Sequence, residues 1–308
     1  MKKISLLFGF TVLTYLGCKK PQSTTTDVPA LNKEILSHTA YDVCSASYTE
    51  MYDRALDLEA AAIALKTNVN DNNLNTCRNA WKEVRHTWET TESWLFGPIS
   101  ANNIDPRIDT WPVDFNAIDS VLNTVNPLTE QYIDNLEDAL KGFHPIEYFL
   151  WGANGNKSAT DFTARQLEYL LALCHNLSKL AQEVNDTWKD SYAGELALAG
   201  SGSVAYPTKN AAFIEIVDAM SGICDEVANG KINEPFLAQD PSLEESPFAK
   251  NSIRDFTQNI KGVMQIYQAN FGEDKSGIED LVKVYNTALD QEIKSAHAEA
   301  IAALNAIT

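Results

Sequence analysis

The chain has 308 residues, of which 44% are hydrophobic, and it carries 42 acidic side chains against 24 lysines and arginines, for a net charge of −18 at pH 7. Such a surface repels polyanions and favours cations, which argues against a nucleic-acid partner. The length suits two domains better than a single core.

The first 17 residues are typical of a bacterial signal peptide. Lys2 and Lys3 precede a short apolar run that is too short to cross a membrane and that ends at Gly17. Cys18 follows, as at a lipoprotein cleavage site, so we expect removal of residues 1–17 and acylation of Cys18. An ordinary secretory signal followed by an incidental cysteine is the alternative. Loss of Lys2 and Lys3 leaves 22 basic against 42 acidic side chains, or −20 in the mature chain.

Residues 18–30 are rich in threonine, proline and serine, lack an apolar pattern, and are predicted to form a flexible tether. The lipid would hold the protein in the bacterial cell envelope, in the periplasm or on the outer-membrane surface. No later segment approaches the ~18 consecutive apolar residues of a membrane helix. Membrane contact is therefore expected through the N-terminal lipid only.

Apolar residues spaced three or four positions apart dominate the N-terminal half, which indicates helices rather than strands. The spacing predicts helices over residues 48–65, 74–95 and 132–152. Gly97 and Pro98 end the second of these. Residues 97–128 contain four prolines and form a long irregular stretch, and a loop of this length is usually functional or structured by packing.

Two glycines and two asparagines interrupt the pattern over residues 152–160, after which Asp161 is a good helix N-cap. Further helices are predicted over residues 161–192, 208–229, 250–270 and 277–305. Their apolar stripes are wide enough to bury against other helices, as in bundles. We therefore predict an all-α fold of two packed helical-bundle domains, residues 31–155 and 156–308.

The mature chain keeps four further cysteines, Cys44, Cys77, Cys174 and Cys224. If helices 161–192 and 208–229 are antiparallel neighbours, Cys174 and Cys224 lie at similar heights. Any disulfide is then expected to be Cys174–Cys224, with Cys44 and Cys77 well apart. Buried free thiols are the favoured alternative.

His144 and Glu147 are three residues apart, so in a helix they share one face and can together hold a divalent or ferric ion. Pro145 fits the first helical turn, and Gly142 allows a sharp turn into it. The helix dipole disfavours a protonated imidazole and leaves a nitrogen free, but it also repels a cation. On spacing alone, a partly buried histidine hydrogen-bonded to its neighbour is the simpler explanation.

The segment Gly142–Gly152, GFHPIEYFLWG, resembles the GxHxxE signature of the imelysin-like family. Three other stretches match that family's pattern: AWKEVRHTWETTE at 80–92 with Phe96-Gly97-Pro98, DTWPVD at 109–114, and ESPF at 245–248 with Asp255-Phe256, Asn259-Ile260 and Tyr267. The resemblance covers nearly the whole mature chain. It implies two helical bundles packed on each other, and the family has been classed with peptidases and, for some members, with iron uptake.

The helix over 74–95 offers further candidate residues for the signature. Four of its side chains share one face: Trp81, Arg85, Trp88 and Glu92. Glu92 matches a family position and is the first choice for a third metal ligand, whereas Asp109 and Asp114, around Trp111, are weaker choices. Arg85, Trp88, Asp109, Trp111 and Gly142 are predicted to line the cleft. The simpler readings are core aromatics for Trp81 and Trp88, and a salt bridge to Glu89 or Glu92 for Arg85.

The sequence contains no His-Glu-x-x-His helix and no Gly-x-Ser-x-Gly elbow, so a peptidase built on His144 and Glu147 needs a general base from elsewhere. We therefore interpret the chain as a membrane-anchored protein that binds a metal ion or small chelate, iron or zinc, in iron acquisition. An envelope transport partner is a further candidate. The alternatives are a metallopeptidase using His144 and Glu147, and a module that binds a non-metal ligand.

Overall fold

The structure, a computed structural model, describes residues 26–273 and 275–307. Over these ranges the chain forms helices and loops without a strand, which confirms the all-α fold. Within the same residues, no helix combines the length and the apolar character that crossing a membrane requires. The predicted signal peptide, Cys18 and most of the predicted tether lie outside the described residues.

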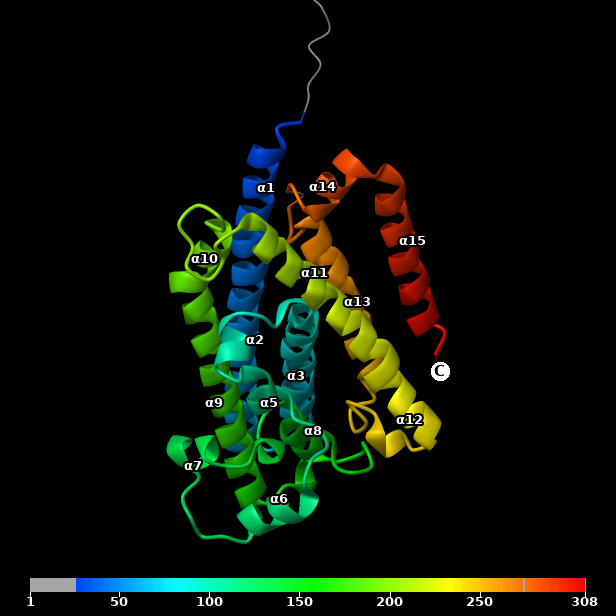
Figure 1. Cartoon of the computed structure of the whole chain (residues 1–308). Coiled ribbons are helices and arrows are strands. Elements are labelled where there is room, and N and C mark those ends of the chain that lie inside the picture. The colour runs from blue at the N-terminus through cyan, green and yellow to red at the C-terminus, as the bar shows by residue number, and fades with distance from the viewer. Residues whose placement is uncertain (1–25, 274, 308) are drawn as a thin grey trace, which may run out of the picture.

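The N-terminal segments form one continuous rod, which runs through α1 (Val28–Ser37), the π-helical η1 (His38–Ser45) and α2 (Ala46–Thr67) (Figure 1). The side chain of Asp27 caps α1 by accepting from the Ala30 N–H. The predicted tether therefore extends too far, because its last residues already belong to a helix.

The rod packs against two long helices, α3 (Asp71–Thr91), which the 3₁₀ turn η2 (Glu92–Trp94) extends, and α9 (Ala164–Thr187). On another side, α3 packs against α13 (Ser252–Gln268).

Capping decides where α9 begins. The Thr163 hydroxyl accepts a hydrogen bond from the Gln166 backbone N–H, and the Gln166 side chain accepts one from the Thr163 backbone N–H. This reciprocal pair makes Thr163 the N-cap. The predicted cap, Asp161, ends a separate 3₁₀ turn, η4 (Ala159–Asp161).

Short elements join α3 to α9: α4 (Pro98–Ala101), α5 (Ile104–Asp109), α6 (Phe115–Leu122), α7 (Glu130–Asp134), the 3₁₀ turn η3 (Asp138–Leu140) and α8 (Phe143–Trp151). The predicted loop at 97–128 is thus largely helical. The predicted helix at 132–152 is instead broken into three pieces, and the second break, between η3 and α8, arises because Lys141 is extended and Gly142 turns the chain at a φ of 81°.

After α9 the chain continues through η5 (Trp188–Tyr192), α10 (Ala193–Ala197), α11 (Lys209–Asp225), η6 (Glu226–Ile232), α12 (Asn233–Ala238) and η7 (Pro241–Leu243) to α13. Both η5 and η6 are π-helical. The chain ends in α14 (Ile278–Tyr285) and α15 (Thr287–Leu304), which extended Asn286 separates within the predicted helix 277–305. In Figure 1, α11 crosses in front of α13, and α15 lies at the edge.

One hydrophobic cluster includes buried side chains from both halves of the sequence, such as Trp88, Phe149, Leu173 and Ile266. A smaller cluster joins α11, α13 and α15 through Ile223, Phe256 and Leu304. The predicted domain boundary near residue 155 stays a prediction.

The four cysteines in the described residues are free thiols. Cys44, Cys77 and Cys174 are buried and Cys224 is exposed. Burial raises the pKa of Cys174, and neighbouring Cys77 raises it further. The Cys174–Cys224 disulfide is not formed. The alternative of buried free thiols is confirmed for Cys174 but not for Cys224, which is free and exposed. The pairing argument fails because α9 packs chiefly on α2 rather than on α11.

Candidate metal centre

Gly142 determines where the signature helix lies. α8 begins at Phe143 because Gly142 adopts a positive φ of 81°. A Cβ at this position would lie 2.1 Å from the backbone oxygen of Ile108, so only glycine allows α8 to start against the end of α5. This approach brings Asp109, the last residue of α5, beside His144 in the first turn of α8. The predicted sharp entry and helix start are confirmed.

His144 is buried between two carboxylates. Its Nε2 lies 3.0 Å from Asp109 Oδ1, and its Nδ1 lies 3.6 Å from Glu147 Oε2. The Trp111 ring packs edge-on, with centroids 5.0 Å apart. Burial lowers the pKa of His144, but the adjacent carboxylates of Asp109 and Glu147 more than offset this and raise it to about 9. Without a metal ion, the two adjacent carboxylates outweigh the dipole of a short helix and favour the protonated imidazole.

Asp109 connects α5 to α3. It accepts a 2.7 Å hydrogen bond from Trp88 Nε1 and forms an ion pair with Arg85 Nη1. Burial raises the pKa of Asp109, yet Arg85 and His144 lower it far more and hold it well below its usual range. Asp109 is therefore a carboxylate at neutral pH.

Arg85 is fully buried and holds several acids at once. Its Nη2 lies 2.5 Å from Glu89 and 3.0 Å from Glu245, and its Nε lies 3.9 Å from Asp255. The predicted salt bridge to Glu89 is confirmed. Trp81 and Trp88 are also fully buried, which confirms them as core aromatics.

Four acidic side chains, Glu89, Glu92, Asp109 and Glu245, form what we call the acidic centre. Each offers a carboxylate oxygen, and these oxygens all lie within 4.8 Å of one another. A metal ion with bonds of about 2.1 Å separates neighbouring ligand oxygens by about 3 Å and opposite ones by about 4.2 Å. Small side-chain movements would bring the four oxygens into that range, so the residues fit a cation.

Close packing of α13 on α3 supplies the polar support of the acidic centre. A Cβ on Gly262 would lie 2.2 Å from the backbone oxygen of Thr90, so the two helices approach this closely only at a glycine. Asn259, one turn earlier in α13, donates hydrogen bonds of 2.8 Å to Glu89 Oε2 and 2.6 Å to Glu92 Oε2.

Six acidic side chains meet here, those of the acidic centre together with Glu147 and Asp255, against the three basic side chains of Arg85, Lys231 and His144. Burial is the main reason that the pKa of Glu92 rises to about 8 and that the pKa of Asp255 lies well above its usual range. Burial likewise raises the pKa of Glu89. A bound cation would relieve the repulsion that otherwise favours protonation of these acids.

Several carboxylate oxygens also lack a hydrogen-bond partner. Glu147 Oε1 accepts from the Ala249 N–H at 2.7 Å. Its Oε2 lies 3.6 Å from His144 Nδ1, beyond hydrogen-bond distance, and Glu245 Oε2 and Asp255 Oδ2 are likewise buried without a hydrogen-bond partner among the described residues. Buried acceptors are normally satisfied, so such a concentration indicates room for a further positive group.

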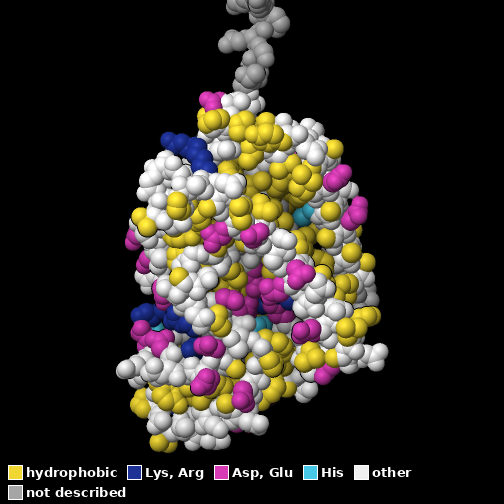
Figure 2. Space-filling model, viewed as in Figure 1, with side chains coloured by type: hydrophobic (Ala, Val, Ile, Leu, Met, Phe, Trp, Pro, Cys, Tyr) yellow, Lys and Arg dark blue, Asp and Glu magenta, His cyan; other side chains and the backbone are white. Residues whose placement is uncertain are grey.

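The acidic centre lies close to the surface. Figure 2 shows acidic side chains around a hollow near the middle of this face, where α3, α5 and α11 come together in Figure 1. Glu245, with 11% of its side chain exposed, is the most accessible of the three glutamates in the acidic centre. By contrast, Asp114 caps α6 by accepting from the Ala117 N–H and takes no part in these contacts.

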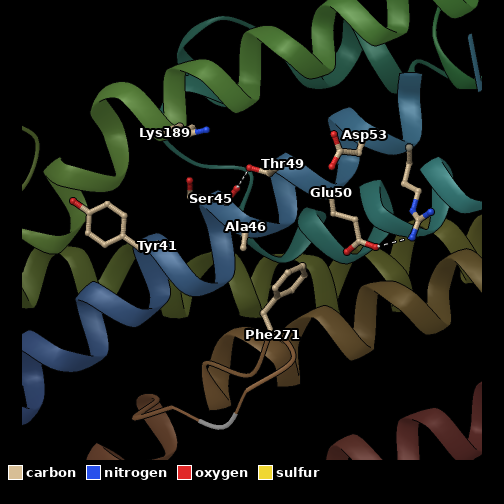
Figure 3. Close-up of a pocket in the computed structure, with 9 residues that line it drawn as sticks. Tyr41, Ser45, Ala46, Thr49, Glu50, Asp53, Lys189 and Phe271 are labelled. Carbon is tan, nitrogen blue, oxygen red and sulfur yellow. Dashed lines mark hydrogen bonds and ion pairs between the residues drawn. The ribbon is translucent and has the colours of Figure 1, made fainter. Parts of the chain in front are cut away.

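A separate open cavity of about 620 Å³ lies between η1, α2, Lys189 and Phe271 (Figure 3). Its lining includes no predicted site residue, and its Glu50 pairs with Arg54 at 3.4 Å. The acidic centre is thus the stronger candidate site.

The predicted cleft residues Arg85, Trp88, Asp109 and Trp111 do come together around His144, and Glu92 belongs to the acidic centre. Sequence reasoning missed Glu89, Glu245, Lys231 and Asn259 as site residues. The sequence indicates Glu89 only as a salt-bridge partner of Arg85. Glu245 and Asn259 lie in a stretch that matches the family pattern, and this match is the signal that could have identified them. No sequence signal pointed to Lys231.

Comparison with known proteins identifies the family of this chain. The family model described as imelysin, Peptidase_M75, matches residues 44–308. The chain is 31% identical over 268 residues to the "Iron-regulated protein A" of Synechococcus elongatus. The matched region covers 85% of this chain and 72% of the relative.

Two crystal structures share the fold. One is described as a putative iron-regulated protein A precursor from Parabacteroides distasonis, with a TM-score of 0.82 and 23% identity over 93% of this chain and 88% of the other. The second is an imelysin-like protein from Psychrobacter arcticum, with a TM-score of 0.71 and 15% identity over 91% and 85% of the two chains.

Proposed function

Because the chain belongs to the imelysin family, we propose that it is a lipid-anchored protein of the bacterial cell envelope that binds iron at the acidic centre and takes part in iron acquisition. The observation that carries this proposal is the set of four carboxylates whose oxygens lie within 4.8 Å of one another. The printed name of the Synechococcus elongatus relative supports a connection with iron.

Glu89, Glu92, Asp109 and Glu245 are the proposed principal ligands. His144 and Glu147 remain the predicted nitrogen and oxygen pair, and they adjoin the acidic centre because His144 Nε2 lies 3.0 Å from Asp109 Oδ1. Carboxylate oxygens suit hard ions, and one imidazole added to them suits iron, provided that the metal displaces the proton of His144. Zinc, which is commonly held by cysteine and histidine, fits this oxygen-rich set less well.

The anchoring part of the proposal rests on the sequence around Cys18 and on the apolar run before it. An anchored binding protein would pass its cargo, a metal ion or small chelate, to a transport partner in the envelope. Mass spectrometry of the mature N-terminus tests the lipid, because acylated Cys18 carries a defined mass increase. An unmodified N-terminus at another residue would refute the anchor while leaving the metal site intact.

The metal site is tested by calorimetric titration of the purified protein with ferrous, ferric and zinc ions, after removal of bound metal by a chelator. We expect iron to bind more tightly than zinc, and Glu92→Gln and Glu245→Gln each to weaken binding about tenfold or more. Glu50→Gln, in the cavity of Figure 3, is the matched control and should bind as the wild type does. Equal binding by all four proteins, or none at millimolar metal, would overturn the proposal.

A further inference from the structure

Lys231 lies where a bound cation would lie. Its Nζ is 2.6 Å from Glu92 Oε2, 2.8 Å from Glu245 Oε1 and 3.6 Å from Glu89 Oε2. Three of the four acidic-centre residues thus face one ammonium group. Lys231 belongs to the π-helical segment η6, which is distant in sequence from α3 and its glutamates. π-helical turns are frequent at functional sites.

The ammonium and a metal ion would compete for the same oxygen atoms. Glu92 Oε2 already receives hydrogen bonds from both Lys231 and Asn259, at 2.6 Å each. Glu245 Oε1 contacts both Lys231 and Arg85. These two oxygens have little remaining capacity, so a metal ion that binds Glu92 Oε2 and Glu245 Oε1 must displace one of the basic groups.

Lys231 is better able to withdraw than Arg85. Arg85 is fully buried, and its planar guanidinium is held by carboxylates on several sides. Lys231 is a point charge on a flexible stem, and 9% of its side chain is exposed. The difference in chemistry and burial singles out Lys231.

A neighbouring cavity offers the ammonium somewhere to go. Lys231 lines a cavity of about 980 Å³ beside α12 and the start of α13, together with the apolar side chains of Phe236 and Phe256. Asp240 and Glu244 line the same cavity and provide carboxylates that can receive the charge. Rotation of the lysine stem therefore exchanges one set of acidic partners for another.

We propose that Lys231 is the specificity-determining residue of the metal site, an internal cation that an incoming metal ion displaces into the adjacent cavity. The inference rests on the proposed function. Displacement breaks short contacts with buried carboxylates, and only an ion of charge 2+ or 3+ recovers that energy from the same oxygens. Lys231 thereby excludes monovalent ions and holds the acidic centre together in the absence of metal.

The test compares wild type with Lys231→Met, which keeps the stem and removes the charge. The matched control is Lys250→Met, since Lys250 lines the same cavity but makes no contact with the acidic centre. We expect Lys231→Met to bind ferrous iron at least about tenfold more tightly and to gain measurable calcium binding, with Lys250→Met unchanged. The melting temperature of Lys231→Met should be lower than that of the wild type without metal, and it should rise more than that of the wild type when metal is added.

Labelling of the wild-type protein makes the same test without substitution. Lys231 should react slowly with an acetylating reagent when metal is absent, and several-fold faster when ferrous iron is present, because the ammonium has moved into the cavity. Lys250 should react alike in both conditions. Peptide mass spectrometry measures both residues, so this measurement decides the question if Lys231→Met does not fold.

The outcomes separate the two proposals. If the wild type binds iron but folded Lys231→Met binds it equally or less tightly, or if metal leaves Lys231 labelling unchanged, Lys231 is a structural residue and the inference is wrong. If neither wild type nor Lys231→Met binds any of the metals, the proposed metal site itself is wrong.

Discussion

His144 Nε2 and Asp109 Oδ1 lie 3.0 Å apart, although the two residues belong to different helices. The contact depends on Gly142, whose missing side chain lets α8 begin against the end of α5. The signature glycine is thus as much a packing residue as a turn residue, and the histidine is held by an acid that lies outside the signature.

Gly142→Ala should both strain the backbone and force α8 away from α5. We expect a loss of about 3 kcal/mol or more in the free energy of unfolding, measured by urea denaturation, together with weaker iron binding. Gly272→Ala is the control, because Gly272 has nearly the same φ, 80°, with nothing within 4 Å of an added Cβ. The control should lose only about 1 kcal/mol, the cost of backbone strain. Equal losses would show that contact with Ile108 is unimportant.

The metal-free protein should lose stability as the pH rises. The pKa of folded His144 is about 9, above its ordinary value of 6.5, so its contribution is complete below pH 6.5 and is lost as the pH rises through 9. Chemical denaturation in the presence of a chelator should show a fall on the order of 3 kcal/mol across this window. His144→Gln should flatten the profile there, and an unchanged profile would contradict the pairing of His144 with Asp109 and Glu147.

Removing the Glu147 side chain should break the hydrogen bond that holds the loop before α13 against α8. Its Oε1 accepts the Ala249 N–H, so Glu147→Ala leaves that donor buried without a partner and should cost about 2–4 kcal/mol. Glu147→Gln retains an acceptor and should cost less. Both variants should weaken iron binding, as measured by calorimetry. Similar stability of the two would show that the hydrogen bond to Ala249 contributes little.

The thiols should differ sharply in reactivity. Cys224 is exposed, whereas Cys44, Cys77 and Cys174 are buried. Of these four cysteines, a thiol reagent should label only Cys224 in the folded protein and all four after unfolding without reductant, as read by peptide mass spectrometry. A Cys174–Cys224 crosslink in the unreduced protein would contradict the structure.

We expect no hydrolysis of general protein substrates by the purified protein. Glu147 holds a backbone N–H and His144 faces two carboxylates, so neither is free to act as a general base in this arrangement. Incubation with denatured casein, with and without a chelator, checks this. Chelator-sensitive cleavage that Glu147→Ala abolishes in a folded protein would instead favour the metallopeptidase alternative.

The sequence alone was sufficient for features that depend on local geometry. Helix pitch places His144 and Glu147 on one face, and the same pitch pairs Arg85 with Glu89. Breaks in the helices were harder to predict. The apolar pattern continues through Lys141 and Asn286, where the backbone is nevertheless extended. Packing against neighbouring helices, which no periodicity reports, decides such breaks.

Only the tertiary structure decided which residues complete the acidic centre. Glu245 and Asn259 reach the acidic centre because α13 packs on α3, and that close approach depends on Gly262. Lys231, which contacts Glu92, lies in η6, a segment with no recognisable motif. A single sequence specifies local spacing through the helix repeat, but contacts between distant segments follow from how the whole core packs. The signature, Arg85 and Asp109 could therefore be recognised from the sequence, whereas the contacts of Glu245, Asn259 and Lys231 could not.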